Sequence, residues 1–388
     1  MKRCFVCHYH EIGLKGDNRS FFEKRLAGNI KSAIADLPHD NVRRIQGRIL
    51  VGLPGSIESA ELEEIGRRLQ RTFGLVSASP GWIVEQNLEA IQESIWRQME
   101  SRAFETFCVR ARRAEKRFPL NSQQINERVG AFLRERSGRR VRLEEPDLTC
   151  HIELVGDLAI LYFDKLPAAG GLPTGCSGKV VVLISGGIDS PVAAYRVMKR
   201  GCRAVFVHFH SFPHTTLDAQ EKVRQIVRIL ARHQGESDLY LVPFAEAQRQ
   251  IVAMTPPETR VVLYRRLMLR LAERIARERA ALALVTGDSI GQVASQTLEN
   301  LAAIGAVAQL PLLRPLVGDD KEEIIAQARR IGTFDVSTIA EVDCCSLFIP
   351  RHPETRASAA AAAQLETSLD LERIVREALE ASVLESIS

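Results

Sequence analysis

A glycine- and serine-rich turn in the middle of the chain has the residues of a phosphate-binding site. Residues 185–190 read Ser-Gly-Gly-Ile-Asp-Ser and follow the apolar run 180–184. The glycines let the backbone approach an anion closely, and the start of the next helix would aim unpaired N–H groups at it. We expect Ser190 to cap that helix and Pro191 to fill its first position. The turn lacks the lysine of a Walker loop, so it indicates another class of nucleotide-binding loop.

Eight cysteines provide the reactive thiols of the chain. A nucleophilic thiol has to be accessible. Cys344 and Cys345 fit best, because polar residues flank them in a loop-like segment, and Cys176 in a glycine-rich stretch is the main rival. Cys4 and Cys7 have the spacing of a metal site, but in a strand they would point to opposite faces. We expect that pair to be buried structural cysteines.

Basic residues concentrate in the N-terminal half. The whole chain carries a net charge of +4, whereas residues 101–142 contain 12 Lys and Arg against 4 Asp and Glu, a difference of +8. Such a cluster predicts a polyanion partner, although a charge run is also typical of a solvated face. The candidates for RNA binding are Arg110, Arg112, Arg113, Lys116, Arg117, Arg139 and Arg140.

Length and composition place limits on the class of protein. A chain of 388 residues predicts two or three domains, and 45% apolar and 26% charged residues are ordinary for a globular protein. No apolar run has transmembrane length and no secretory leader is recognisable, so we expect a cytoplasmic protein that does not enter a membrane. Scattered cysteines in apolar surroundings favour free thiols over a disulfide scaffold.

The elements that must position the turn alternate regularly between strand and helix. This pattern predicts a doubly wound parallel α/β sheet, whose ligands bind at the carboxyl ends of the strands. The expected helical tail covers residues 356–384. The strands are expected at 180–184, 204–209, 239–244, 281–286 and 310–316.

Several further motifs, in order along the chain, resemble those of one family. They are His-Glu-Ile-Gly-Leu-Lys-Gly at 10–16, Phe-Pro-Leu at 118–120, Gly-Gly-Leu-Pro at 170–173, the block 286–297 and Asp-Lys-Glu-Glu-Ile at 320–324. Together with the serine–glycine turn, which resembles the loop of ATP pyrophosphatases (PP-loop), they are similar to the tRNA 4-thiouridine synthetases, or tRNA sulfurtransferases. The resemblance covers most of the chain.

The resemblance implies an order of domains. A ferredoxin-like α+β domain is expected at 1–59 and an RNA-binding THUMP domain at 60–165. A linker at 166–178 would lead into a Rossmann-like PP-loop ATP pyrophosphatase domain with a helical tail at 179–388. Many relatives add a C-terminal rhodanese domain, and we expect this chain to be a short form without one.

The resemblance also implies a reaction. ATP adenylates the C4 oxygen of uridine 8 in tRNA with release of pyrophosphate. A cysteine persulfide, charged by a cysteine desulfurase, then supplies sulfur at C4 and AMP leaves as 4-thiouridine forms. The family is tied to thiamine thiazole synthesis as well. The oligomeric state is left open, and a homodimer is one option.

Site residues follow from the match position by position. The implied catalytic residues are Cys344, Cys345, Asp189 and Lys321, with ATP and Mg²⁺ as cofactors. No metal site is assigned, although Asp189 could hold Mg²⁺. Because the turn has no lysine, Lys321 and Arg265 would supply the positive charge. The residues expected around the nucleotide are Leu183, Ile184, Ser185, Gly186, Gly187, Asp189, Ser190, His208, Phe209, Arg265, Gly287 and Gln296.

Two other functions compete with this interpretation. The first keeps the adenylation and changes the acceptor, as in another PP-loop amidotransferase or ligase; the basic domain and Cys344-Cys345 argue against it. The second is a non-catalytic tRNA-binding protein with a relic loop. The complete set of loop residues, with Lys321, argues against that.

Overall fold

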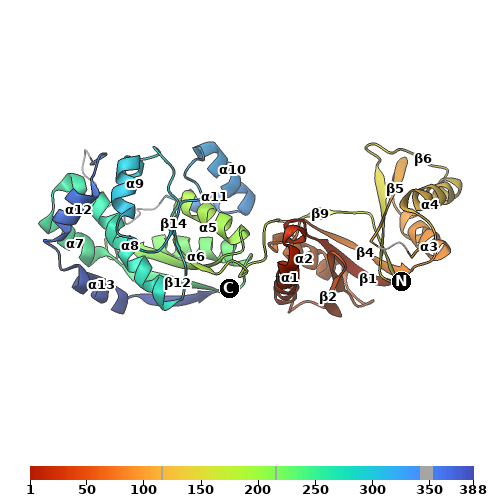
Figure 1. The fold of residues 1–388 in the computed structure, drawn as a ribbon, viewed down its shortest axis with the longest axis horizontal. Helices are drawn as coiled ribbons and strands as arrows, with labels where there is room; N and C mark the ends of the chain where they lie inside the picture. The colour runs from red at the N-terminus through yellow and green to blue at the C-terminus, as the bar shows by residue number, and fades with distance from the viewer. Residues whose placement is uncertain (115–116, 215, 341–352) are drawn as a thin grey trace. The chain divides into compact units, whose positions relative to one another are not determined.

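The computed structural model describes residues 1–388 except 115–116, 215 and 341–352. The chain forms two compact units, residues 1–173 and 174–388 (Figure 1). None of the helices in the described residues combines the length and apolar composition that crossing a membrane requires.

One large, mostly antiparallel sheet organises the first unit. The strand order is β2-β3-β1-β4-β8-β7-β5-β6, and β9 pairs with β4 beside this path. The strands are β1 (Lys2–His8), β2 (Asn41–Ile45), β3 (Arg48–Gly52), β4 (Ser77–Glu85), β5 (Thr106–Arg113), β6 (Arg140–Val141), β7 (Leu148–Val155), β8 (Leu158–Tyr162) and β9 (Leu166–Pro167).

Four helices divide the core of this unit into two parts. Helices α1 (Arg19–Ala33) and α2 (Ser59–Arg71) pack with β1 and β3 around Phe5 and Ile65, while α3 (Leu88–Met99) and α4 (Ser122–Ser137) pack with β5 and β7. Helix α2 therefore shares its core with the first strand, although the expected boundary between residues 59 and 60 would assign nearly all of this helix to the second domain.

Strand β4 joins the two parts and was not predicted. It pairs with β1 along one edge and with β8 along the other, so it is central to the sheet. Its sequence does not read as a strand, because it contains Pro80 and Gly81, and proline and glycine are depleted in central strands. Gly81 is required there, since a β-carbon at this position would collide with the carbonyl oxygen of Leu161.

The residues expected as a linker begin as part of the first unit. Leu166 pairs with Ala78 as β9 adds to β4. Beyond β9, the backbone N–H groups of Ala168 and Gly170 donate to the carbonyls of Val76 and Leu75. The division between the two units follows Pro173.

The second unit contains the doubly wound sheet that the alternating pattern predicts. The strand order is β14-β13-β10-β11-β12-β15, and neighbours from β14 to β12 are parallel. The expected tail was wrong at its end, where β15 pairs antiparallel with β12. The strands are β10 (Lys179–Leu183), β11 (Arg203–His210), β12 (Ser237–Pro243), β13 (Leu284–Val285), β14 (Leu312–Leu313) and β15 (Val383–Ile387).

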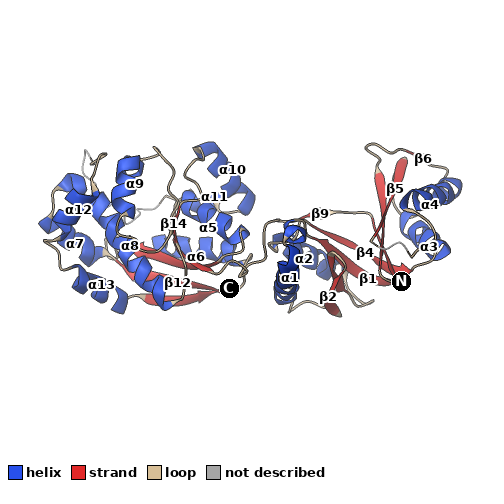
Figure 2. Cartoon of the chain, viewed as in Figure 1, coloured by secondary structure: helices blue, strands red, loops and turns tan. Residues whose placement is uncertain are grey.

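Helices flank this sheet (Figure 2). One group consists of α5, α6, α10 and α11, and α8 packs with α7, α9, α12 and α13. The bounds are α5 (Asp189–Lys199), α6 (Leu217–Ala231), α7 (Ala245–Met254), α8 (Arg260–Glu278), α9 (Leu298–Gly305), α10 (Lys321–Ile331), α11 (Phe334–Ser337), α12 (Ala359–Glu366) and α13 (Leu371–Glu380).

The strand order creates the place for a ligand. From β10 the chain moves outward through β11 to β12, and then crosses back to β13 on the other side of β10. Loops that follow β10 and β13 therefore diverge at the carboxyl edge of the sheet. Ligands of open α/β sheets bind at such a reversal of strand order.

Candidate functional site

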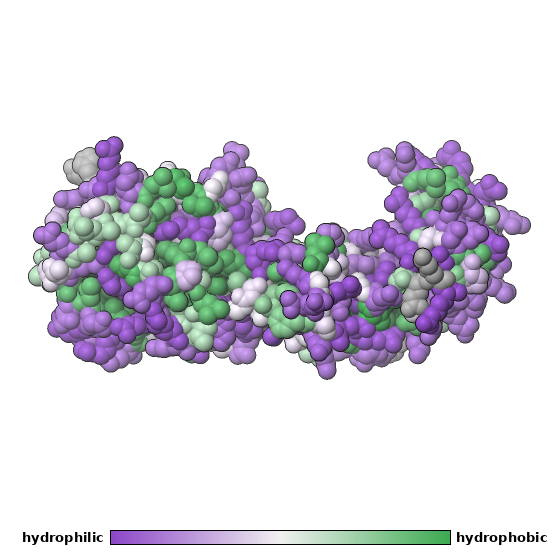
Figure 3. Space-filling model, viewed as in Figure 1, coloured by the Kyte–Doolittle hydropathy of each residue, from purple (hydrophilic) through white to green (hydrophobic). Residues whose placement is uncertain are grey.

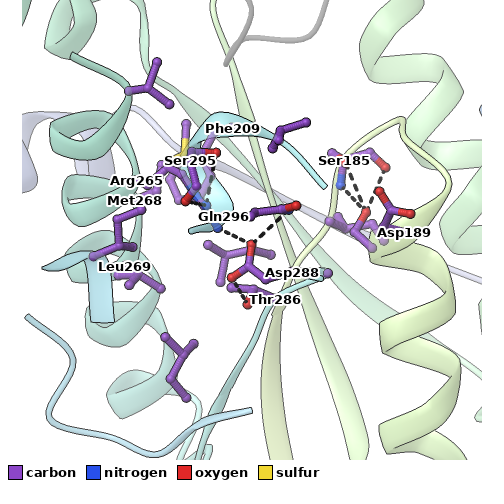
Figure 4. A pocket seen from close by; sticks show the side chains of 18 of the residues that line it. Ser185, Asp189, Phe209, Arg265, Met268, Leu269, Thr286, Asp288, Ser295 and Gln296 are labelled. Carbon is purple, nitrogen blue, oxygen red and sulfur yellow. Dashed lines mark hydrogen bonds and ion pairs between the residues drawn. The ribbon is translucent and has the colours of Figure 1, made fainter. Parts of the chain in front are cut away.

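A pocket of about 310 Å³ opens at this reversal (Figure 4). Its volume is in the range of small-molecule sites, about 300–1,000 Å³. The ends of β10, β11 and β13, the start of α5 and one side of α8 contribute to its walls. Ten of the twelve residues expected around the nucleotide line it: Leu183, Ile184, Ser185, Asp189, Ser190, His208, Phe209, Arg265, Gly287 and Gln296.

The serine–glycine turn is closed by its own two serines. The N–H of Ser185 donates to Ser190 Oγ at 2.9 Å, and the two hydroxyl oxygens lie 3.1 Å apart. The expected cap is wrong, because α5 begins at Asp189 after Ile188, and Ser190 lies inside the helix. Its hydroxyl turns back to the loop instead. The turn is thereby held open around its glycines, of which Gly187 donates its N–H to Ser185 Oγ at 3.3 Å.

Gly287 lets the loop after β13 pack directly against the first residues of α5. A β-carbon at this position would lie 2.8 Å from the nitrogen of Ser190 and 2.9 Å from its Cα. Backbone atoms cannot retreat as the end of a flexible side chain can. The loop after β13 therefore reaches the serine–glycine turn and the start of α5 only because residue 287 is glycine.

Asp189 is held by two side chains from distant segments. Its Oδ1 lies 2.7 Å from Nζ of Lys321, and its Oδ2 accepts from Nε2 of Gln292 at 3.0 Å. Lys321 is the first residue of α10, whose start is fixed by a capping box between Asp320 and Glu323. The expected cation is thus delivered to the turn by a helix terminus.

Asp288 is the centre of the opposite wall, and it was not among the residues predicted to surround the nucleotide. The carboxylate is 3% exposed and pairs with Arg265, and with Arg314 at 3.3 Å. It also accepts from Thr286 Oγ1 at 2.7 Å. Burial alone would raise the pKa of Asp288, but Arg265 and these donors hold it below the ordinary value. In Figure 4, Arg265 and Gln296 both reach Asp288.

Gln296 offers an unused acceptor. Its side chain is 9% exposed, and Oε1 has no hydrogen-bond partner within the described part of the chain. Buried polar atoms are normally satisfied, so an acceptor left open in a pocket wall is suited to a ligand that donates a hydrogen bond.

The end of the pocket near α8 is apolar. Met268, Leu269 and Phe209 line it, and Phe209 packs edge-on against Phe244 with ring centroids 5.5 Å apart. His208 is buried and donates from Nδ1 to the carbonyl of Ile184 at 3.1 Å. An apolar end beside α8 and a serine–glycine turn with a helix start at the other end are suited to a nucleobase joined to phosphates.

Cys344 and Cys345 lie outside the described residues, but residues before and after their segment are placed. Ser337, in α11, donates to the carbonyl of Gly187 at 3.3 Å. On the far side, Thr297 Oγ1 donates to the carbonyl of Thr355 at 2.7 Å. Thr297 directly follows Gln296, so both anchoring points adjoin the pocket.

Cysteines in the described part of the chain differ in burial. Cys4 and Cys7 are fully buried in two different clusters, and burial raises the pKa of Cys4 to about 12. Burial likewise raises the pKa of Cys150 to about 12. Cys176, the rival thiol, is partly exposed. No group of three or more metal-binding side chains occurs among the residues that the structure describes.

The predicted RNA-binding residues separate into two kinds. Arg110, Arg112 and Arg117 are exposed, as are Arg139 and Arg140, while Lys116 lies outside the described residues. Arg113 instead donates to the carbonyls of Phe118 and Leu120 at 3.0 and 2.8 Å, so it stabilises the loop after β5. Hydrophilic side chains cover most of the end of this unit that carries α3 and α4 (Figure 3).

The exposed arginines lie at both ends of β5. Arg140 pairs with Thr106, where the strand begins, and Arg112 lies six residues further on, opposite Glu153. At about 3.3 Å per residue this separates them by roughly 20 Å. Burial and the nearby Lys165 lower the pKa of His151 to about 4, so the ring beside Arg110 is neutral at pH 7.

Models of three protein families match successive parts of the chain. Residues 4–79 match the ThiI ferredoxin-like domain, residues 85–164 match the THUMP domain, and residues 175–371 match the thiamine biosynthesis protein ThiI. These three matches follow one another without overlap and cover both compact units.

Relatives and a solved structure match nearly the whole chain. A probable tRNA sulfurtransferase of Moorella thermoacetica is 44% identical over 381 residues, which is 98% of this chain and 96% of the relative. That of Thermus thermophilus is 44% identical over 371 residues, 96% of this chain and 90% of the relative. A 4-thiouridine synthetase crystallised with RNA and bound ATP superposes with a TM-score of 0.89 at 35% identity, covering 100% of both chains.

Proposed function

The chain belongs to the ThiI family of tRNA sulfurtransferases, and on that premise we propose which of its residues carry out each step of ATP-dependent tRNA thiolation. The enzyme is a transferase that uses ATP to introduce sulfur into tRNA. This excludes the non-catalytic and the ligase alternatives.

ATP binds with its base in the apolar end of the pocket and its phosphates on the turn at 185–190. The observation that carries this assignment is the gathering of ten predicted residues from distant segments in one pocket. The C4 oxygen of uridine 8 attacks the α-phosphorus, and the bond to the β-phosphate oxygen breaks. Pyrophosphate leaves with the electron pair, and AMP stays on the uridine.

Asp189 and Lys321 act at the phosphate end. The carboxylate cannot donate to a phosphate while it is ionised, so its contribution is to hold Lys321 over the turn. Lys321 is 42% exposed and reaches incoming phosphates as a point charge.

Asp189 is also the residue that would hold Mg²⁺. Magnesium is usually bound by one or two carboxylates together with substrate phosphates. Asp288, the other carboxylate on the pocket wall, is buried between two arginines, Arg265 and Arg314, whereas the side chain of Asp189 is 22% exposed. When bound, Mg²⁺ would neutralise phosphate charge.

Sulfur enters from a persulfide on Cys344 or Cys345. A cysteine desulfurase charges the thiol, the outer sulfur attacks C4, and AMP departs, which leaves a C4–S–S–Cys disulfide. A second thiol then attacks the cysteine sulfur of this bond. The S–S electron pair goes to the sulfur on C4 as 4-thiouridine forms, and the two thiols end as a disulfide. Support comes from Ile339 and Ser337, the described residues before this segment: Ser337 bonds to the turn itself. Cys344 is five positions after Ile339, a separation that an extended chain spans with about 17 Å.

The first unit presents the tRNA. Arg110, Arg112 and Arg117 contact phosphates at one end of β5, and Arg139 and Arg140 do so at the other. Contacts of this kind fix the position of RNA and carry no sequence information. We place the reaction in the cytoplasm. A homodimer is the proposed assembly, and light scattering of the purified protein would test it.

Mass analysis of tRNA tests the proposal. Unmodified tRNA is incubated with ATP, Mg²⁺, cysteine, a cysteine desulfurase, a thiol reductant and the protein, and its nucleosides are separated. We expect 4-thiouridine at position 8 with the wild type, and neither pyrophosphate release nor thiolation with Asp189→Ala, although that variant still binds tRNA. Thiolation at full rate by Asp189→Ala would refute the role of the turn.

A further inference from the structure

A second lysine lies against the phosphate-binding turn, and none of the proposed steps uses it. Lys222 comes from α6, which packs beside β11 and β12, and its side chain is 8% exposed. A lysine buried to this extent is almost always paired with an anion or a hydrogen-bond acceptor. Sequence patterns did not identify it, because it is one polar residue on the buried side of an amphipathic helix.

Gly186 and Lys222 fit together. A β-carbon at residue 186 would lie 3.2 Å from both Cδ and Cε of the lysine, and 3.5 Å from Nζ. The stem of Lys222 therefore occupies the space that a side chain at 186 would need. Its ammonium donates to the carbonyl of Ile339 at 2.6 Å, which fixes the direction of the charge beside the turn.

The two lysines stand at opposite ends of the turn. Lys321 contacts Asp189, at the start of α5, whereas Lys222 adjoins Gly186, close to the end of β10. A Walker loop carries its own lysine; here two segments that are remote in sequence bring cations to a turn that has none. The ammonium groups of Lys222 and Lys321 therefore place positive charge at both ends of the turn.

We propose that Lys222 is a phosphate-binding residue, which holds the β- and γ-phosphates of ATP at the Gly186 end of the turn. This rests on the proposed placement of the triphosphate. As the bond between the α- and β-phosphates breaks, the leaving pyrophosphate gains negative charge. A buried ammonium, already oriented by Ile339, stabilises that charge more than a solvated one would.

Binding of inorganic pyrophosphate and of AMP, measured separately by calorimetry, tests the proposal. We expect Lys222→Met to weaken pyrophosphate binding about tenfold or more, as when a charge-assisted hydrogen bond is removed. AMP binding should change less than about twofold, because AMP lacks these phosphates. Lys222→Arg, which keeps the charge, should retain most of the affinity. Arg228→Met, an exposed position on the same helix, is the matched control.

Two results would overturn the proposal. Unchanged pyrophosphate binding in Lys222→Met shows that the ammonium does not bind phosphate. Equal weakening of pyrophosphate and AMP means that the lysine only supports the turn through Ile339. If the methionine variant does not fold, Lys222→Gln gives the same comparison without the charge. A wild-type enzyme that binds pyrophosphate but makes no adenylated tRNA refutes the proposed reaction and leaves the role of Lys222 to these titrations.

Discussion

The ammonium of Lys321 lies 2.7 Å from the carboxylate of Asp189, although Lys321 is 132 positions further along the chain. A helix that follows β14, the last of the parallel strands, thus completes a turn that follows β10, the first of them. The same carboxylate accepts from Gln292, so three segments meet at one side chain. Through this ion pair, Lys321 places a positive charge beside the serine–glycine turn.

Replacing Lys321 with Met should slow AMP transfer to tRNA by about 10- to 150-fold, the equivalent of a charge-assisted hydrogen bond worth about 1.5–3 kcal/mol. The measurement is transfer of label from α-labelled ATP to tRNA. Lys321→Arg should recover part of the rate, since the charge remains. A rate within twofold of the wild type in Lys321→Met would show that this cation does not reach the phosphates.

Gly287→Ala should disable the ATP pocket. The new methyl group meets the backbone of Ser190, and overpacking of this kind costs about 1–3 kcal/mol. We expect weaker ATP binding in calorimetry and a lower melting temperature. Gly318→Ala is the matched control in the same unit, because a β-carbon there meets nothing within 4 Å. Equal behaviour of the two variants would contradict the direct packing of the loop after β13 against α5.

Single substitutions of Cys344 and Cys345 by Ser should stop 4-thiouridine formation and spare the AMP transfer step. The thiol acts only after adenylation, so the two activities separate. Both are read from the same tRNA, by label and by nucleoside mass. Cys176→Ala is the control, and it should thiolate normally. Loss of thiolation in that variant alone would move the persulfide to Cys176.

The arginines of β5 should differ in what they do. Arg110→Gln with Arg112→Gln should weaken tRNA binding and reduce its dependence on salt by about one unit of slope for each phosphate that is no longer neutralised. Arg113→Gln should leave that slope unchanged and lower the melting temperature, because its guanidinium holds two carbonyls of the loop. Filter binding of tRNA at several salt concentrations measures this slope for each variant. A changed slope in Arg113→Gln would mean that this side chain binds a phosphate.

Glu153 should make the first unit sensitive to acid. Burial raises the pKa of this carboxyl, but the hydrogen bond and charge of His8 and the charge of Arg48 outweigh it and bring the pKa to about 2. A depressed pKa stabilises the fold above the unfolded value of about 4.5, and that contribution is lost as the pH falls from there towards 2.

The matched variant is Glu153→Gln. At pH 7 it should be less stable by about 3–5 kcal/mol, because Arg48 loses its buried partner. The gap to the wild type should narrow as the pH falls below 4.5. Urea unfolding of the full chain at several pH values measures this gap. A gap that stays constant with pH would show that the pKa of Glu153 is the same in the folded and the unfolded chain.

Much of the candidate nucleotide site was predictable because its signals are local. The turn at 185–190 combines a buried strand, two glycines and a helix start within a dozen residues, and each part constrains the next. The doubly wound sheet followed from the regular alternation of strand and helix. Family motifs extended these local signals to His208, Arg265 and Gln296, which line the same pocket.

Other features had no local signal. Strand β4 contains Pro80 and Gly81, and only its two neighbours in the sheet make it a strand. Strand β15 reads as the end of a helical tail and becomes a strand by pairing with β12. Ser190 has the side chain of a helix cap, yet its hydroxyl bonds to Ser185 because the folded turn offers a nearer partner.

The sequence by itself determined the class of chemistry, since the residue types and spacings of a phosphate-binding turn are set within a short stretch of chain. Tertiary structure alone decided which side chains complete the site. Asp288 gathers Arg265 and Arg314, and Lys222 reaches Gly186, only because the sheet brings the ends of separate strands and helices to one edge. Electrostatic partners act over a few ångströms in space, and the separation of residues along the chain does not encode that distance.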